Sequence, residues 1–295
     1  PAYHPRQRTE TPIDTYVRSK DPDALIASAA ADLTPVSDDR PYFFNFVRWT
    51  ELGRAADTLD AEVTVTQGNP LFLLGQLGLA LLAGLLVLGA PLLLGGRAKP
   101  PGDEPRGRAP VAASALYFSA VGAGFIAAEV ALMQKLVLML GHPLYSVTVT
   151  LASMLLATGI GAYLSRNRFA APTRAIWWIP LGLALSLGAL SLFDAELVRA
   201  VAPLSTATRF AIAAAIVAPV GLAVGVPFSH GLSLLEQSAP RLVPWAWATN
   251  AVATVVGSVL TVIVSMNFGF RSVFLVSVLL YALAAAAARG LRRGE

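Results

Sequence analysis

From residue 70 to the C-terminus the sequence is a succession of long apolar segments joined by short polar connections. About 20 consecutive apolar residues form an α-helix long enough to cross the hydrocarbon core of a bilayer. Such segments cover residues 70–95, 112–140, 143–164, 175–193, 209–229, 244–266 and 269–288. The sequence therefore predicts an all-α integral membrane protein, with a bundle of about seven transmembrane helices over residues 70–295.

The composition agrees with a membrane location and excludes several kinds of site. Only 14% of the 295 residues are charged, whereas soluble domains carry about a quarter. The chain has no cysteine, which excludes disulfides, thiolate catalysis and Cys-ligated metals. Its three histidines are scattered along the sequence and give no basis for a His-rich centre. We therefore predict no metal site in this chain.

Residues 1–69 have a different character and lack any apolar segment of membrane length. They carry 7 basic and 11 acidic residues, a net charge of −4, whereas residues 70–295 carry 15 and 7, a net charge of +8. We predict an extramembrane segment with a short helix over residues 22–32 that is capped by Asp21, and a strand-like run at 61–66. Because no start Met or signal peptide precedes Pro1, we expect a C-terminal piece of a longer protein.

Basic residues in the connections predict the orientation of the bundle. Four Lys or Arg lie in residues 97–110, three in residues 165–174 and three more in the C-terminal tail, while the alternate connections are nearly free of them. The positive-inside rule then places the basic connections and the C-terminus in the cytoplasm, and residues 1–69 outside. Basic and aromatic residues do not alternate as on a nucleic-acid-binding surface. The predicted environment is the lipid bilayer.

Glu129 is the most unusual residue of the predicted bundle, because it is an acidic side chain deep inside a membrane-length segment. An ionisable group there is costly unless it is paired or faces a polar interior. Two interpretations remain open: Glu129 fixes helix packing as a neutral or hydrogen-bonded group, or it binds a proton, a cation or an amine. Lys135, six positions further on, lies about 120° around the helix and can extend to the nearer interface.

Two further polar residues are candidates for the membrane interior. His142 precedes Pro143 at a predicted tight turn between two antiparallel helices, and is either a turn residue at the interface or part of a polar path. Asn250 begins a stripe of small polar residues along the sixth segment and is a candidate partner for Glu129. In the fifth segment, a GxxxG motif between Pro219 and Pro227 predicts a kinked or broken helix, serving either packing or a transport site.

In the N-terminal segment, Asp38, Asp39 and Arg40 precede a dense cluster of aromatic residues. They form either an ordinary turn or a polar constellation at the junction of a domain with the membrane. No catalytic or cofactor-binding motif is present in the chain. The stretch 122–127 fits G-x-G-x-x-A, but it lies inside a long apolar run and not between a strand and a helix, so we do not assign it to a nucleotide.

Several stretches together resemble a known family. They are LTPVSDDRPYFF, AEVALMQKLVLMLGHPLYS, VGVPF, PWAWATNAVATVVGSVL and MNFGFR. They are similar to the C-terminal region of bacterial multi-spanning membrane proteins of the spermidine/spermine synthase-like type. In that family a Rossmann-type domain, related to aminopropyltransferases and S-adenosylmethionine-dependent methyltransferases, lies between membrane segments. Residues 1–69 would then be the tail of such a domain and a linker.

The resemblance implies a role in polyamine biosynthesis for the full-length protein, with any transferase activity and any S-adenosylmethionine-type cofactor located in the upstream domain. This chain would be its membrane module, which anchors that domain and offers a path for its substrate. Glu129, His142 and Asn250 would line the path, and Asp38, Asp39 and Arg40 would tie the domain to the bundle. The alternative is a transporter or exporter of a small, polyamine-like cation that uses Glu129.

Overall fold

The computed structural model describes residues 18–28, 34–42, 49, 70–94, 108–168 and 194–292. The chain divides into two compact units, Pro1–Leu74 and Gly75–Glu295. In the described ranges the regular structure is helical, and the two residues that pair as an isolated bridge, Ser37 and Arg40, form no strand.

In the N-terminal unit, helix α2 covers Pro22–Ser28. The side chain of Asp21 accepts a hydrogen bond from the backbone N–H of Ala24 at 3.0 Å, which satisfies one of the free donors of the first turn. The predicted cap is therefore confirmed. The helix was expected to reach residue 32, but residues 29–33 lie outside the described part, as does the strand-like run at 61–66.

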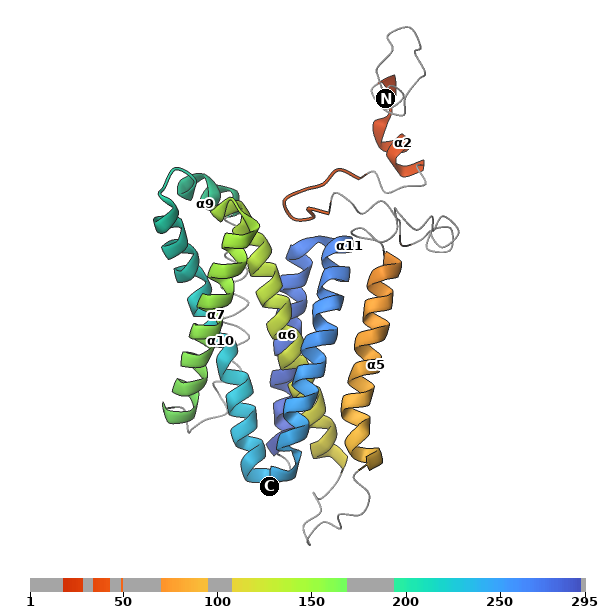
Figure 1. Ribbon diagram of the computed structural model, residues 1–295, viewed down its shortest axis with the longest axis vertical. Coiled ribbons are helices and arrows are strands. Elements are labelled where there is room, and N and C mark those ends of the chain that lie inside the picture. Colours follow the sequence, from red (N-terminus) through yellow and green to blue (C-terminus); the bar gives the residue numbers. More distant parts are fainter. Residues whose placement is uncertain are drawn as a thin grey trace. The chain divides into compact units, whose positions relative to one another are not determined.

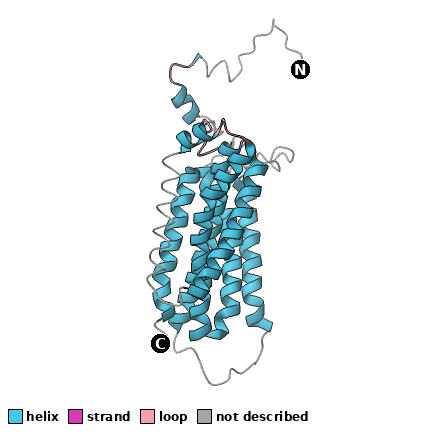
Figure 2. Ribbon diagram, turned by 90° about the vertical axis from the view of Figure 1, so that its left-hand side faces the viewer, coloured by secondary structure: helices cyan, strands magenta, loops and turns pink. Residues whose placement is uncertain are grey.

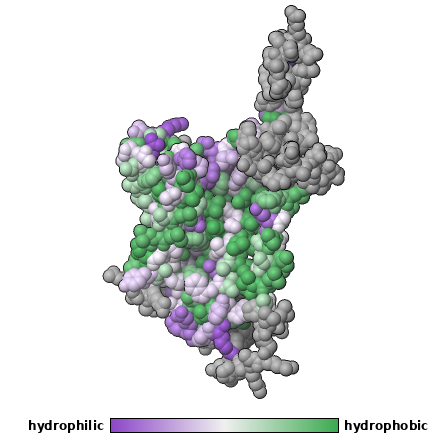
Figure 3. All heavy atoms as spheres, in the orientation of Figure 1, coloured by the Kyte–Doolittle hydropathy of each residue, from purple (hydrophilic) through white to green (hydrophobic). Residues whose placement is uncertain are grey.

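The second unit is a bundle of long helices that run side by side (Figures 1 and 2). Its elements are α5 (Pro70–Leu94, which begins in the first unit), α6 (Arg108–Leu140), α7 (Pro143–Arg168), α9 (Asp194–Val201), α10 (Thr206–Ser238), η2 (Pro240–Leu242) and α11 (Val243–Arg292). Among the described residues, five helices are long and apolar enough to cross a membrane. Apolar side chains cover the middle of the face of the bundle seen in Figure 3, with polar ones toward the ends. The prediction of an all-α membrane protein is confirmed for these helices.

Helix α11 contains two helices of membrane length and not one. Its 50 residues are interrupted at Gly269, whose φ of 80° and ψ of 169° are non-helical and accessible mainly to glycine. Asn250 lies against Gly122 and Tyr281 against Gly124, so two residues of α11 that would be about 46 Å apart in a straight helix meet neighbouring turns of α6. The chain therefore reverses direction within α11, as Figure 1 shows, and the non-helical Gly269 lies where the two segments predicted at 244–266 and 269–288 meet.

The total of seven spans is not confirmed, because the predicted fourth segment, residues 175–193, lies outside the described residues. The other six segments correspond to described helices. Most of α5 faces outward, since only 6% of its most apolar stretch is buried, against 50% for α6. Helix α5 is thus a lipid-facing helix, while α6 lies at the core of the bundle.

The fifth predicted segment corrects an expectation. Helix α10 runs without interruption from Thr206 to Ser238 through Pro219 and Pro227, so it is not broken. Each proline removes one backbone hydrogen bond, but the surrounding helices hold α10 in place. The Tyr117 hydroxyl of α6 donates to the carbonyl of Pro227, and Gly231 leaves the space that the Tyr117 ring fills. The irregular backbone of the bundle lies instead at Gly269.

Helices α7 and α10 approach each other very closely along a surface we call the α7–α10 seam, formed by Gly161, Gly221, Gly225, Ala157 and Thr158. A Cβ added at Gly221 would lie 2.7 Å from that of Ala157, and one at Gly161 or Gly225 would overlap the backbone of the facing helix. The Thr158 hydroxyl donates to the Gly221 carbonyl at 3.2 Å. The GxxxG motif therefore serves helix packing, as small residues do in membrane bundles.

Candidate functional site

Glu129 is buried in the bundle with an unsatisfied carboxylate oxygen. It lies eleven residues before the end of α6 and is 5% exposed. Its Oε1 has no hydrogen-bond partner in the described part of the chain. An unpaired polar group in an apolar interior is costly, and more so for a charged group. The position thus has the property that makes an intramembrane carboxylate a functional candidate.

Thr150 of α7 lies at the same level of the bundle as Glu129. One helical turn away, the hydroxyl of Ser146 donates to the backbone carbonyl of Met133, which fixes the register between α6 and α7. These helices are antiparallel, because they are joined by the short turn at Gly141 and His142. One turn beyond Ser146 on α7 is Thr150, and one turn before Met133 on α6 is Glu129. The two residues therefore lie at the same level. Thr150 is completely buried and its Oγ1 also lacks a hydrogen-bond partner among the described residues.

Sequence reasoning did not single out Thr150. It grouped this residue with the other small hydroxyl residues of the same segment as packing chemistry, because a helix sequence cannot show which hydroxyls find acceptors. The only available clue was the spacing of Ser146 and Thr150, which puts both on one face of α7. We call the pair of residues Glu129 and Thr150 the Glu129–Thr150 site.

Lys135 does not neutralise Glu129. It is half-buried on α6, six residues beyond Glu129, and no ion pair joins the two in the described chain. This agrees with the prediction that the two residues are poorly placed for an i,i+4 pair.

His142 lies at the turn between α6 and α7 and does not reach the interior. It is exposed, and its Nδ1 accepts a hydrogen bond from the backbone N–H of Leu144 at 3.1 Å while its carbonyl accepts one from Ser146. These are the contacts of a residue that caps the start of α7. Gly141 before it has a φ of 76° and ends α6. The path that we expected His142 to line together with Glu129 is therefore not formed at this residue.

Asn250 is also separated from Glu129, contrary to the predicted pairing. Its backbone carbonyl and its Oδ1 lie 2.5 and 2.9 Å from where a Cβ on Gly122 would stand. Gly122 precedes Glu129 by seven residues, about 10 Å along the helix. The first half of α11 runs parallel to α6, since Asn250 meets Gly122 and Gly257 meets Ile126. Asn250 thus lies about two helical turns from the level of Glu129, toward the N-terminal end of α6.

Asp38, Asp39 and Arg40 belong to a turn in the N-terminal unit. The backbone groups of Ser37 and Arg40 bond to each other in both directions, at 2.9 and 3.3 Å, and the Arg40 guanidinium donates to the Thr34 hydroxyl at 3.4 Å. The local geometry is that of an ordinary polar turn. Nothing in it bears on the expected link between a domain and the bundle.

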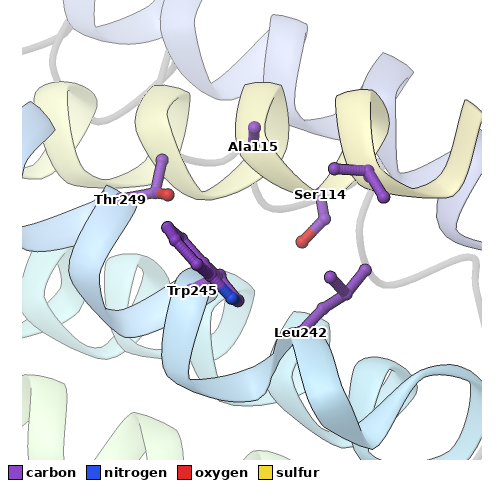
Figure 4. A pocket seen from close by; sticks show the side chains of 6 residues that line it. Ser114, Ala115, Leu242, Trp245 and Thr249 are labelled. Atoms are coloured by element: carbon purple, nitrogen blue, oxygen red, sulfur yellow. The ribbon is translucent and has the colours of Figure 1, made fainter. Parts of the chain in front are cut away.

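A separate pocket of about 310 Å³ lies between the start of α6 and the start of α11 (Figure 4). Its lining is mostly apolar and consists of Val111, Ser114, Ala115, Leu242, Trp245 and Thr249. Ser114 and Thr249 contribute the two hydroxyl groups. The side chains of Ser114, Leu242 and Trp245 point into the space between the two helices. Ser114 precedes Glu129 by fifteen residues, about 22 Å along α6. The pocket is therefore separate from the Glu129–Thr150 site.

Chemically, the described interior offers oxygen ligands and hydrogen-bonding groups but no nucleophile activated by a base. No group of three or more His, Asp or Glu among the described residues could hold a metal ion. Comparison with known proteins found no matching family model, no matching curated protein and no matching solved structure. The candidate site is therefore interpreted from its own geometry.

Proposed function

We propose that this chain is the membrane module of a spermidine synthase-like protein and anchors an upstream synthase- or methyltransferase-like domain. The division of the chain between Leu74 and Gly75, where a separate unit continues into the lipid-facing helix α5, supports this proposal. A helix that is exposed along most of its length is suited to tether a domain without disturbing the core of the bundle. The sequence stretches that resemble the family extend over both units.

The one stretch that matches a nucleotide-binding pattern does not fit a nucleoside cofactor in the part of the chain that the structure describes. The stretch 122–127 that matches a nucleotide-binding pattern is inside α6. Gly122 is packed against Asn250 and Gly124 against Tyr281, so no phosphate or adenosine group could approach their backbone. An S-adenosylmethionine-type cofactor, if the full-length protein uses one, would be held by the upstream domain.

The proposal is tested on the full-length protein and on a version that ends before residue 70. We expect the full-length protein to fractionate with membranes and to transfer an aminopropyl or methyl group to a polyamine-like acceptor. The shortened version should become soluble, with its transferase activity retained or reduced. Absence of a glycine-rich cofactor loop from the upstream sequence, or of any such transfer by the full-length protein, would rule the proposal out.

A second candidate function is the transport of a small cation, and the unsatisfied Oε1 of Glu129 favours it. The discriminating variant is Glu129→Gln in the full-length protein. Loss of cation flux in vesicles with unchanged product formation would support transport. Unchanged flux and unchanged product formation would leave Glu129 a packing residue and the bundle an anchor.

The orientation of the module in a bacterial plasma membrane belongs to the same proposal. We place the C-terminus in the cytoplasm, because the basic connections border it. An upstream domain that uses a cytosolic cofactor requires residues 1–69 on the same side, whereas seven spans put them outside. Since the chain has no cysteine, single-cysteine variants at Asp23 and Gly294 can be labelled with a membrane-impermeant maleimide. Labelling of both from one side would require an even number of spans.

A further inference from the structure

The two unsatisfied oxygens of the Glu129–Thr150 site contrast with the hydroxyls that join helices in the bundle interior, although the hydroxyls of Ser165 and Tyr281 also have no hydrogen-bond partner among the described residues. Ser146 donates to the Met133 carbonyl, Thr158 to Gly221 and Ser277 to Gly124, the last at 2.8 Å. Each of these hydroxyls joins two helices. Thr150 and Glu129 are equally well buried, yet their Oγ1 and Oε1 have no such partner in the described chain.

Thr150 also does not use the acceptor that is always available to a threonine in a helix. The hydroxyl of a helical Thr commonly bonds to the carbonyl four residues earlier, and Thr148 does this with Leu144 at 2.9 Å. Thr150 has no such bond. By the register of α6 and α7, two buried oxygens on neighbouring helices thus belong to residues at one level of the bundle, and neither has a hydrogen-bond partner in the described chain.

We propose that Glu129 and Thr150 bind one small monovalent cation, H⁺ or Na⁺, with the carboxylate and the hydroxyl oxygen as its ligands. Oxygen ligands are those that hard cations prefer. A single positive charge neutralises the carboxylate, which reduces the cost of its burial. Bound as a proton, the cation makes the carboxyl a donor to the Thr150 hydroxyl; bound as Na⁺, it lies between the two oxygens.

No described side chain supplies that charge. Lys135 forms no ion pair with Glu129, and the titratable groups on the helices that contact α6 are placed differently. Arg271 on α11 is exposed, and His142 and Arg209 lie at the turn end of α6. Among the side chains that the structure describes, the remaining ones on these helices are Tyr145, Tyr163, Glu196, Arg199, His230, Glu236 and Tyr281.

The packing around the site limits the size of the ligand. The Ser146 hydroxyl bonds to the backbone of α6 one turn from Glu129, and this close approach of α6 and α7 favours a small ligand over an extended diamine. The pocket that could hold a larger molecule is about 22 Å away along α6. The inference deepens the second proposed function, because it names the ligand of the same carboxylate, but cation binding itself does not require transport.

The test is made on the full chain reconstituted in lipid nanodiscs. Thermal unfolding is followed in NaCl and in choline chloride of equal ionic strength, and the infrared band of a protonated carboxyl is recorded. The variants are Glu129→Gln, Thr150→Val and Thr150→Ser. The matched control is Thr148→Val, which removes an exposed hydroxyl two residues away on the same helix.

Na⁺ binding predicts that saturating NaCl raises Tm by about 5 °C in the wild type. The rise should persist in Thr150→Ser and Thr148→Val, weaken in Thr150→Val and vanish in Glu129→Gln. Proton binding predicts no effect of Na⁺ and a protonated-carboxyl band that Glu129→Gln abolishes. Thr150→Val should shift that band and Thr148→Val should not.

The proposal is overturned if the wild type shows neither response, or if Thr150→Val and Thr148→Val behave alike. Flux in vesicles is measured separately. Cation binding without flux would remove the second proposed function and leave this inference intact. Flux of a polyamine by a protein that shows neither response would overturn this inference and support the second proposed function.

Discussion

The α7–α10 seam and the Glu129–Thr150 site are both buried contacts of helix α7, but they treat polar atoms differently. In the seam, glycines bring two backbones together and the one hydroxyl, that of Thr158, has an acceptor on the facing helix. At the Glu129–Thr150 site, the side chains of two helices bring oxygens to the same level without a bond. The seam has the features of a packing surface, whereas the site has buried oxygens that packing leaves without a hydrogen-bond partner, and such groups call for an explanation.

The comparison predicts that the seam contributes strongly to stability. Gly161→Val should destabilise the bundle by about 3 kcal/mol or more, because its side chain would overlap the backbone of Leu222 and force α7 and α10 apart. The measurement is thermal unfolding in nanodiscs. Gly159→Val is the control, since a Cβ at Gly159 meets nothing within 4 Å. Equal losses in the two variants would show that the seam is not a close contact.

A second prediction concerns the reversal of α11, which brings its two halves against α6. Gly269→Ala should lower the free energy of unfolding by about 1–3 kcal/mol, because a side chain is strained at this backbone conformation. Gly78→Ala on α5, where a Cβ would be unobstructed, should be neutral or slightly stabilising. If Gly269→Ala were as stable as the wild type, α11 would not reverse at this glycine.

A third prediction separates hydroxyls that join helices from hydroxyls that bond within one helix. Ser277→Ala removes a bond to the Gly124 carbonyl of α6 and should cost about 1 kcal/mol. Ser272→Ala, on the same half of α11, removes only an exposed bond to Phe268 and should change stability much less. A similar loss in both variants would contradict the role of Ser277 in joining α6 and α11.

The smallest effect is expected at His142. His142→Ala should cost about 0.5 kcal/mol through loss of the cap of α7, and His142→Asn should restore most of it, because Asn is a good cap. Neither change should alter the response to Na⁺ or the carboxyl band described above. If His142→Asn abolished that response, the turn would belong to the Glu129–Thr150 site after all.

Local features of the bundle could be predicted because they depend on properties of single segments. Apolar length located the membrane-length helices that the structure describes, though not the short helix α9, and Gly141 with Pro143 located the turn after α6. The Asp21 cap followed from the residue type at the start of α2. The expectation of a broken α10 was wrong because prolines weaken a helix locally, while neighbours such as Tyr117 decide whether it stays continuous.

The candidate site was only half predictable. Glu129 was identified from the sequence, since a carboxylate in an apolar segment is unusual wherever that segment packs. Its neighbours were not: Asn250 was expected beside it and lies two turns away, and Thr150 was not singled out. Which residues of two helices share a level depends on the register between them, and that register was set by the contact of Ser146 with Met133.

The sequence by itself therefore determined that this protein is a helical membrane bundle with an acidic side chain in its interior. Both features follow from the free energy of transferring side chains from water to lipid, which is favourable for apolar groups and unfavourable for a carboxylate. Only the tertiary structure decided that α11 reverses near Gly269, that α10 is continuous, and that Thr150 of α7 shares the level of Glu129. These features depend on contacts between helices far apart in the chain. Small residues and single hydrogen bonds select those contacts from many alternatives that bury a similar apolar area.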